Sequence, residues 1–532
     1  MNNIYFIGMC ITMLLYIVVG FVISKRVKTA NDYYVAGRNA PAFLITGSLV
    51  ASFIGVGLFM GDVGECYSGF FAPIIVAVGV LSVGYIVGSV VFGRYLRRSE
   101  AVTIAEFFSK RFDSKAMKNL STATGTIIML VYMLSTVQGI GTLMSVVTGV
   151  SYNICIALAV IAFTLISMMS GSKGVLITDT IMFAVFTVAT LIGAFFIARA
   201  AGGWTDAVSE MAIYKNIPGI LSWTGNADYF YPTGTENMVW AFGYGIAWMS
   251  VLMVAPWQSS RYLMAKNEHS VIRSGIVASV AVFLIEFFMC MAGVFVQKIN
   301  PGMEAPSQAL IWASMNLMPK ILGIVVLSGV LAAGISSATT FLSLIGSNVA
   351  NDILAIKDGK KSIRAGRLAI LVAAVIVLVL CVLNPPAIFW ITYLGATIIA
   401  CSWMPVAIAS IWSKRVTKTG AFCGMLVGFI VSSIMKIFVS AQGITLPIYF
   451  DPFFIGLASN ICAMIIGSAL TKVTDAEKRQ RARLFAMPQE ELDVKEIKKT
   501  KICMVASICL GGVVTIVLLF LWAFPYLNGI GY

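Results

Sequence analysis

One apolar stretch of this chain carries a glycine break that would expose backbone oxygens. It reads SLVASFIGVG over residues 48–57, with Gly55 and Gly57 at the break. Because no water reaches the hydrocarbon core of a bilayer, a glycine-rich interruption of a spanning helix usually lines a cavity or binds an ion. Unwinding here would free the carbonyl oxygens of Ala51 and Ile54, and Ala51 lies near the middle of its predicted span.

A second stretch, residues 331–340, offers hydroxyl groups. Ala333, Ser336 and Ser337 share one face of the predicted helix. The Ala333 carbonyl and the two hydroxyls would complete a set of neutral oxygens with the first stretch. Hard cations prefer oxygen ligands, and an uncharged set favours a weakly held monovalent ion over Ca²⁺ or Mg²⁺. The spacing fits equally well with serines that bond back to their own helix or join neighbouring helices.

The elements that must position these groups follow from the composition. Hydrophobic residues make up 59% of the 532 residues and charged residues only 11%, against about 25% charged in soluble domains. Apolar runs of roughly 20 residues recur about fourteen times, each long enough to cross a hydrocarbon core of about 30 Å. We therefore predict an all-α polytopic protein of the lipid bilayer, with about 14 transmembrane helices. The ten cysteines are scattered singly, which is typical of small buried side chains rather than of disulfides or a metal site.

The formal net charge of +14 reflects topology. Of the 37 Lys and Arg residues, 32 fall in alternate loops. Those loops are 25–38, 94–118, 173, 261–273, 357–367, 414–418 and 472–501. By the positive-inside rule these loops are cytoplasmic, which places both termini outside the cell (plasma or bacterial inner) membrane if fourteen helices are present. We expect no nucleic-acid partner, and an acidic loop at 201–236 is predicted to be extracellular.

The spans form two groups of five helices in opposite orientation, which indicates an inverted repeat. Amphipathic stretches at Ile104–Phe112 and Ser307–Leu317 precede the third helix of each group from opposite sides. The predicted divisions are an N-terminal extra helix (1–40), a first repeat (41–200), the extracellular loop (201–236), a second repeat (237–413) and C-terminal helices (414–532) that include a cytoplasmic linker (472–501).

Several motifs in order along the chain carry a family resemblance. They are DYYVAGR at 32–38, Ala51 to Ile54, Thr103 to Phe112, Gly174 to Thr180, SRYLMAK at 260–266, Leu331 to Ser337 and Pro405 to Gly428. With these motifs the chain resembles the solute:sodium symporter family from about Asn31 to Leu470. The family includes sodium-coupled carriers of proline, pantothenate, sugars and sialic acid. The resemblance implies the five-plus-five inverted-repeat fold shared with the leucine transporter.

The resemblance also implies where sodium, the expected coupling ion, would bind. The first sodium site maps onto Ala51, Ile54, Ala333, Ser336 and Ser337. A second site of some members maps onto Asp179, Ser336, Thr339 and Thr340. A carboxylate in hydrocarbon costs roughly 2.5 to 3.5 kcal/mol and is normally partnered, so Asp179 faces either a sodium ion or hydroxyls and a basic side chain. Met182 departs from relatives that often have Gln at this position.

By analogy, the solute would bind outward of the sodium ion. The candidate wall residues are Gly57, Asp62, Gln138, Trp248, Glu286 and Tyr393. Phe53 replaces the Asp of the proline-carrying branch, so proline specificity is not transferred. Asp62 and Glu286 could receive an amino or quaternary ammonium group, with Trp248 as a cation–π face; alternatively, Asp62 caps a helix and the aromatic ring only packs.

The function predicted for the chain is sodium-coupled symport of a small polar organic solute by alternating access. The alternative is a proton-coupled carrier of the same fold that uses Asp179 or Glu286, although the only histidine, His269, is predicted to lie in a cytoplasmic loop. No HExxH, GxSxG or CxxC motif is present, so we expect no enzyme activity. A channel would need a continuous polar pore, so a channel is less consistent with the broken helices. The sequence does not indicate an oligomeric state.

Overall fold

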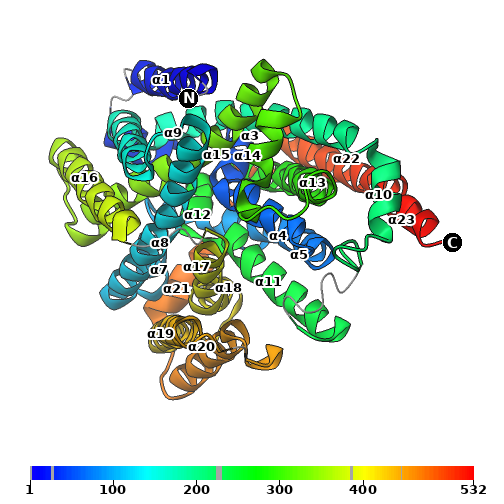
Figure 1. Cartoon of the computed structure of the whole chain (residues 1–532). Helices are drawn as coiled ribbons and strands as arrows, with labels where there is room; N and C mark the ends of the chain where they lie inside the picture. The colour runs from blue at the N-terminus through cyan, green and yellow to red at the C-terminus, as the bar shows by residue number, and fades with distance from the viewer. Residues whose placement is uncertain (1–2, 25–28, 223–230, 384–387, 445) are drawn as a thin grey trace.

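The computed structural model describes residues 3–24, 29–222, 231–383, 388–444 and 446–532, and most of these lie in helices, with no strand among them (Figure 1). The main helices are α1 (Asn3–Ser24), α3 (Ala42–Phe53), α4 (Val63–Tyr67), α5 (Phe71–Val87), α7 (Ile104–Phe112), α8 (Lys115–Thr148), α9 (Tyr152–Ala200), α10 (Trp204–Ala212), α11 (Gly234–Val254), α12 (Pro256–Met264), α13 (Glu268–Ile299), α14 (Ala309–Asn316), α15 (Lys320–Ser347), α16 (Gly359–Leu383), α17 (Ile388–Ser402), α18 (Met404–Trp412), α19 (Lys418–Gln442), α20 (Pro452–Ala469), α21 (Asp475–Phe485), α22 (Val494–Leu518) and α23 (Phe524–Gly529). Lys25, Arg26, Lys28 and Asp228 lie outside the described residues.

The number of membrane spans agrees with the sequence. Among the described residues, 13 helices are long and apolar enough to cross a bilayer, and a bent pair brings the number to 14. The long helix α9 holds two of these spans, because the backbone turns at Gly171 with φ 54°. The predicted amphipathic stretches are also helical, as α7 and α14. The expectation of about fourteen spans is confirmed, whereas the predicted domain boundaries stay predictions.

The bent pair is the glycine-broken span. Helix α3 ends at Phe53, and Ile54 takes an extended conformation (φ −64°, ψ 108°) while its N–H still bonds to the carbonyl of Val50. The chain resumes as a π-helical segment at Gly57–Asp62 that runs into α4, bent by 46° from α3. A helix end leaves its last carbonyls without intrahelical partners, so the break presents backbone oxygens to groups outside α3 within a membrane span.

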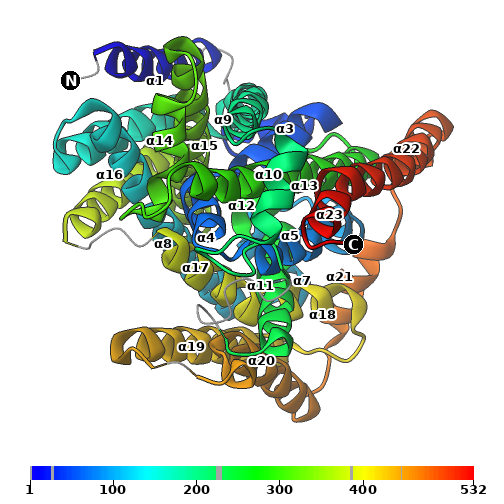
Figure 2. The same cartoon turned by 45° about the vertical axis from the view of Figure 1, so that its right-hand side comes forward.

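The helices around this break form the middle of the molecule. Helix α1 lies on one flank and the α19–α20 pair on the opposite flank, with α3, α12 and α15 between them (Figures 1 and 2). From Val326 to Ser347 every residue of α15 is buried. The broken span therefore meets a helix that is enclosed by protein, as a binding site within a bilayer requires.

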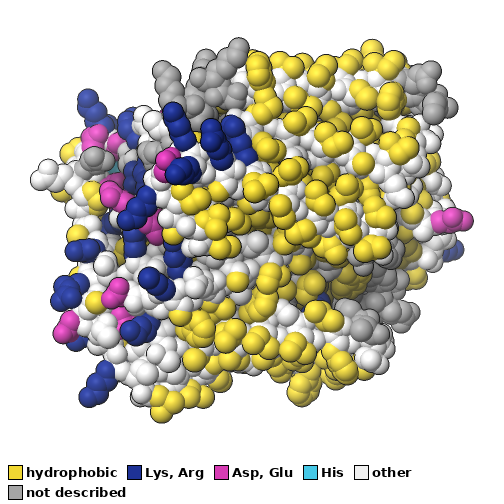
Figure 3. Space-filling model, turned by 90° about the vertical axis from the view of Figure 1, so that its left-hand side faces the viewer, with side chains coloured by type: hydrophobic (Ala, Val, Ile, Leu, Met, Phe, Trp, Pro, Cys, Tyr) yellow, Lys and Arg dark blue, Asp and Glu magenta, His cyan; other side chains and the backbone are white. Residues whose placement is uncertain are grey.

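Charged and apolar side chains occupy different parts of the surface. On the face shown in Figure 3, Lys and Arg gather toward one end, while exposed apolar side chains cover most of the remainder. The apolar belt includes residues of α1, α16, α19 and α22 such as Leu14, Leu383, Ile434 and Ile508. This pattern fits a protein held in a bilayer with most of its basic residues on one side.

Two segments that the sequence predicts as a loop or a linker contain helical residues that are buried in the structure. Arg261, counted above among loop residues, lies inside α12 and is only 2% exposed. The linker at 472–501 contains α21, whose residue Glu477 is buried and accepts a hydrogen bond from the backbone N–H of Lys418 at 2.6 Å. The prediction that Arg261 lies in a loop was wrong, because Pro256–Met264 forms the separate helix α12 and the Arg261 guanidinium pairs with Asp179 in the interior.

Candidate functional site

The residues expected to bind sodium converge where the break in α3 faces α15. Ser336 Oγ donates a hydrogen bond to the carbonyl of Ala51 at 3.0 Å and thereby joins the two helices. Ser337 Oγ donates to the carbonyl of Ala333 at 3.2 Å within α15. Ile54 forms the break itself, and all of these residues are buried. Five residues from two distant stretches thus lie around one point of the fold.

The donor set fits a monovalent cation. A hydroxyl oxygen retains lone pairs while its proton is donated elsewhere, so Ser336 and Ser337 can each face a cation. A Cβ built on Gly55 would lie 3.1 Å from Ser337 Oγ, which shows that this hydroxyl lies directly against the broken backbone. Carbonyl and hydroxyl oxygens without a carboxylate suit a weakly held ion of single charge rather than Ca²⁺ or Mg²⁺.

A buried ionic network lies beside this point. Asp179 of α9 is fully buried and accepts hydrogen bonds from Ser48 Oγ at 2.6 Å, Ser336 Oγ at 2.7 Å and Arg261 Nη2 at 2.8 Å. The same Arg261 nitrogen donates to Thr340 Oγ1 at 2.6 Å. The guanidinium therefore bridges two of the residues assigned by resemblance to a second sodium site.

The Arg261 side chain is held in place by more than one bond. Its Nε donates to Ser48 Oγ at 2.9 Å, and its Nη1 donates to the carbonyl of Trp257 and to Ser260 Oγ. Thr339 Oγ1 donates to the carbonyl of Ser336. The alternative in which Asp179 pairs with a basic side chain is thus realised in this structure, and the second sodium site stays a prediction.

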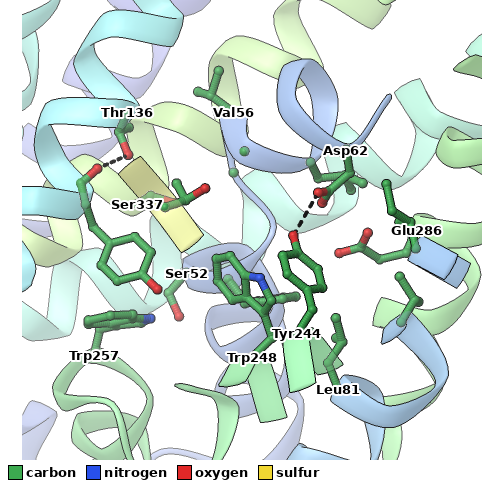
Figure 4. A pocket seen from close by; sticks show the side chains of 18 of the residues that line it. Ser52, Val56, Asp62, Leu81, Thr136, Tyr244, Trp248, Trp257, Glu286 and Ser337 are labelled. Atoms are coloured by element: carbon green, nitrogen blue, oxygen red, sulfur yellow. Dashed lines mark hydrogen bonds between the residues drawn. The ribbon is translucent and has the colours of Figure 1, made fainter. Parts of the chain in front are cut away.

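A cavity lies beside the break in α3 (Figure 4). Its free volume is about 50 Å³, room for roughly four water molecules. Of the predicted solute-binding residues, Gly57, Asp62, Trp248 and Glu286 line it. The remaining lining residues are Ser52, Phe53, Gly55, Val56, Leu58, Ile74, Val78, Leu81, Tyr132, Thr136, Tyr244, Trp257, Ser337, Phe341 and Thr392. Because Ser337 belongs to both places and Gly55 of the lining directly follows Ile54, the cavity adjoins the candidate sodium site.

Two predicted residues do not line this cavity. Gln138 is fully buried in α8, and its carbonyl accepts a bond from Thr142 Oγ1. Tyr393 lines a neighbouring hollow, where the ammonium nitrogen of Lys436 lies 4.0 Å from the centre of its ring. The adjacent residue, Thr392, faces the cavity instead, since one step along a helix turns a side chain by about 100°.

Carboxyl groups and aromatic rings dominate the cavity. Asp62 accepts a hydrogen bond from the Tyr244 hydroxyl at 3.1 Å, and the Glu286 carboxyl points toward the same space (Figure 4). Phe53 and Trp248 meet edge to face with ring centres 5.5 Å apart. Tyr244 was not among the residues predicted from the sequence, although it lies four residues before Trp248 in α11 and so shares its helix face.

A broken span in an all-α membrane fold, with a cavity and a candidate cation site beside it, is the arrangement typical of a secondary transporter. The chain belongs to the sodium:solute symporter family, which it matches over residues 33–428. That family consists of transporters, with sodium as a coupling ion rather than a resident cofactor.

Relatives of known activity share this family. The chain is 24% identical over 459 residues to the sodium/proline symporter of Escherichia coli (strain K12), covering 81% of this chain and 87% of that protein. It is 21% identical over 422 residues to the sodium/pantothenate symporter of Haemophilus influenzae (strain ATCC 51907 / DSM 11121 / KW20 / Rd), covering 77% and 85%. Because these relatives carry different solutes, membership of the family does not by itself identify the solute that this protein binds.

Solved structures agree in fold. A sodium-coupled sialic acid symporter in a substrate-bound, outward-open state aligns with a TM-score of 0.70 and 19% identity, covering 88% of this chain and 98% of that one. A nucleobase–cation symporter in a closed conformation aligns with a TM-score of 0.55 and 12% identity, covering 85% and 98%. At such identities the likeness shows the fold alone.

Proposed function

We propose that this protein imports a small polar organic solute together with sodium, by alternating access. The observation that carries the proposal is the meeting of the broken α3 span with α15, where Ser336 Oγ lies 3.0 Å from the carbonyl oxygen of Ala51. Sodium would bind among Ala51, Ile54, Ala333, Ser336 and Ser337. The solute would occupy the adjoining cavity, so that one helix break contacts both.

We propose one sodium ion per transport cycle. Support comes from the Arg261 guanidinium, which donates to both Asp179 and Thr340. A cationic side chain at this position neutralises the carboxylate and repels a second cation. One sodium ion entering at about −100 mV supplies roughly 2.3 kcal/mol, and a tenfold concentration gradient adds about 1.4 kcal/mol. Together these support roughly 500-fold accumulation of a neutral solute.

We also propose the orientation of the chain. The basic loops would face the cytoplasm, with both termini outside a cell membrane, which in a bacterium is the inner membrane. Support comes from the charged end of the molecule seen in Figure 3, because positive residues near span ends favour the cytoplasmic side.

The experiment that tests the proposal is thermal unfolding of the purified protein in sodium chloride against potassium chloride at matched ionic strength, with a panel of solutes. A ligand that binds the folded state raises the unfolding temperature. We expect a shift specific to sodium that one class of solute enlarges, because the two sites share residues and reciprocal coupling follows. No sodium effect at any pH would contradict the proposal and favour the proton-coupled alternative.

A further inference from the structure

The cavity beside the break in α3 is unbalanced in charge. Asp62 and Glu286 both line it, and its described lining residues include no Lys, Arg or His. Both carboxyl groups face the same space (Figure 4), and Glu286 is only 2% exposed. Two ionised carboxyl groups in a largely apolar space are costly unless they take up protons or a positive group joins them. A cationic ligand would supply that group.

Unpartnered polar atoms in the same cavity point to a hydrogen-bonding ligand. Among the described residues, Glu286 Oε2 has no hydrogen-bond partner, and neither has the hydroxyl of Tyr132, which is 5% exposed. Figure 4 shows the Glu286 carboxyl directed toward Asp62 and Tyr244. A buried polar atom without a partner carries a desolvation penalty that a bound donor removes. The carboxylate oxygen accepts only, so its ligand has to donate an N–H or O–H.

The walls favour an organic cation over a metal ion. Phe53, Tyr132, Tyr244, Trp248 and Trp257 line the cavity. Aromatic faces attract ammonium groups through their quadrupoles, and sites lined by several rings bind organic ammonium groups. An inorganic cation with its demand for many oxygen ligands finds few of them among these rings.

From these features we propose that the transported solute carries a protonated primary or secondary amino group, held between Asp62 and Glu286 against the rings of Tyr244 and Trp248. The proposal rests on the symport function proposed above. The N–H bonds of the amine satisfy Glu286 Oε2, which a quaternary ammonium group cannot do. The small volume of the cavity requires a compact solute, and sodium at the neighbouring site contacts the other side of the same helix break.

The test measures sodium-dependent stabilisation of the full-length purified protein by matched solutes. The panel contains small amines and amino acids, their neutral hydroxyl analogues and carboxylic acids, all in saturating sodium chloride. We expect stabilisation by a member with a protonated amine. Stepwise N-methylation of that solute to the quaternary form should weaken its binding about 10- to 150-fold, as expected for loss of a hydrogen bond to a charged group.

Substitutions of the two carboxyl groups test whether these groups bind the amine. Glu286→Gln keeps the shape of the side chain and removes its charge, so it should weaken the amine at least about tenfold while the sodium shift stays as in the parent. Asp62→Asn, which can still accept from Tyr244, is the second variant if the first is unstable. Glu65→Gln is the matched control, because Glu65 follows Asp62 by three residues but lines a different hollow.

The outcomes separate this proposal from the function on which it rests. A sodium-specific shift enlarged only by neutral or anionic solutes, or by none of the amines, would overturn the amine proposal and leave sodium symport standing. Amine binding that survives both Glu286→Gln and Asp62→Asn would also overturn it. Loss of the sodium shift itself in the parent protein would instead remove the proposed function.

Discussion

Replacing Ser337 with alanine removes one proposed sodium ligand while disturbing little else. The described hydrogen bond of Ser337 Oγ stays within α15, to the Ala333 carbonyl at 3.2 Å, so the variant cuts no bond between helices there. The hydroxyl lies against the break, where a Cβ on Gly55 would come within 3.1 Å of it. Ser336 is a poorer choice because its hydroxyl also contacts Asp179 and Ala51.

The size of the effect follows from these contacts. A contact to a charged partner contributes about 1.5 to 3 kcal/mol, so Ser337→Ala should raise the sodium concentration for half-maximal transport about 10- to 150-fold. The lost bond within α15 contributes only about 0.5 to 1.5 kcal/mol, against a total stability of about 5 to 15 kcal/mol. The variant should therefore reach the membrane at near-normal levels.

The assay is solute uptake against sodium concentration, normalised to the amount of protein at the cell surface. Ser343→Ala is the matched control, since this buried serine of the same helix lies six residues further on and outside both the site and the cavity lining. We expect parent-like sodium dependence in the control. Parent-like dependence in Ser337→Ala as well would remove Ser337 from the proposed site.

Three further predictions concern the ion pair, the sodium count and the topology. Arg261→Gln leaves Asp179 buried and unpaired, so thermal unfolding should show a loss of about 3 to 5 kcal/mol, part of which returns when Asp179→Asn is added; an unchanged unfolding temperature would refute the pairing. If one sodium ion is carried per cycle, the Hill coefficient for the dependence of solute uptake on sodium concentration is near one in the parent and in Thr340→Ala. A coefficient near two in the parent that falls in the variant would establish a second ion. A membrane-impermeant maleimide should label Tyr532→Cys in intact cells and Lys360→Cys only after permeabilisation, and the reverse result would invert the proposed topology.

The sequence predicts the break in α3 well because its cause is local. Two glycines within an otherwise apolar span weaken the helix at a definite place, and the structure bends there, between Phe53 and Gly57. The number of spans is equally local, since each depends on the length and hydropathy of one stretch. The inverted repeat follows from the order of spans and is borne out by the fold of the solved relatives.

The partner of Asp179 could not be predicted in the same way. Arg261 is 82 residues away along the chain, and the sequence placed it in the predicted cytoplasmic loop 261–273. Helix α12, which begins at Pro256 as a separate helix, brings its guanidinium to Asp179 of α9. A hydropathy profile places the end of a span at an arginine, because a lone charge is costly in the bilayer. A carboxylate inside the protein lowers this cost by pairing with the guanidinium.

The cavity lining was predicted in part for a related reason. Asp62, Trp248 and Glu286 stand out because charged or amphipathic residues inside spans are rare. Tyr132, by contrast, comes from α8, and its approach to Trp257, with ring centres 4.8 Å apart, depends on how α8 packs against α12. The rotation of a helix about its axis decides whether Thr392 or Tyr393 faces the cavity, and composition carries little information on that rotation.

The hydroxyl of Ser336 gives the proposed symport a physical link between sodium and the helices around it. Its single proton faces two acceptors, the Ala51 carbonyl at 3.0 Å and Asp179 Oδ1 at 2.7 Å. On the proposed mechanism, sodium takes the carbonyl and the lone pairs of Ser336, so the proton is left entirely to Asp179. The hydrogen bond from Ser336 to Asp179 then becomes stronger. Asp179 in turn pairs with Arg261 of α12, so the effect reaches that helix. Sodium binding at the break in α3 would thereby also stabilise the packing of α9, α12 and α15, and such differential stabilisation of one conformation is what alternating access needs.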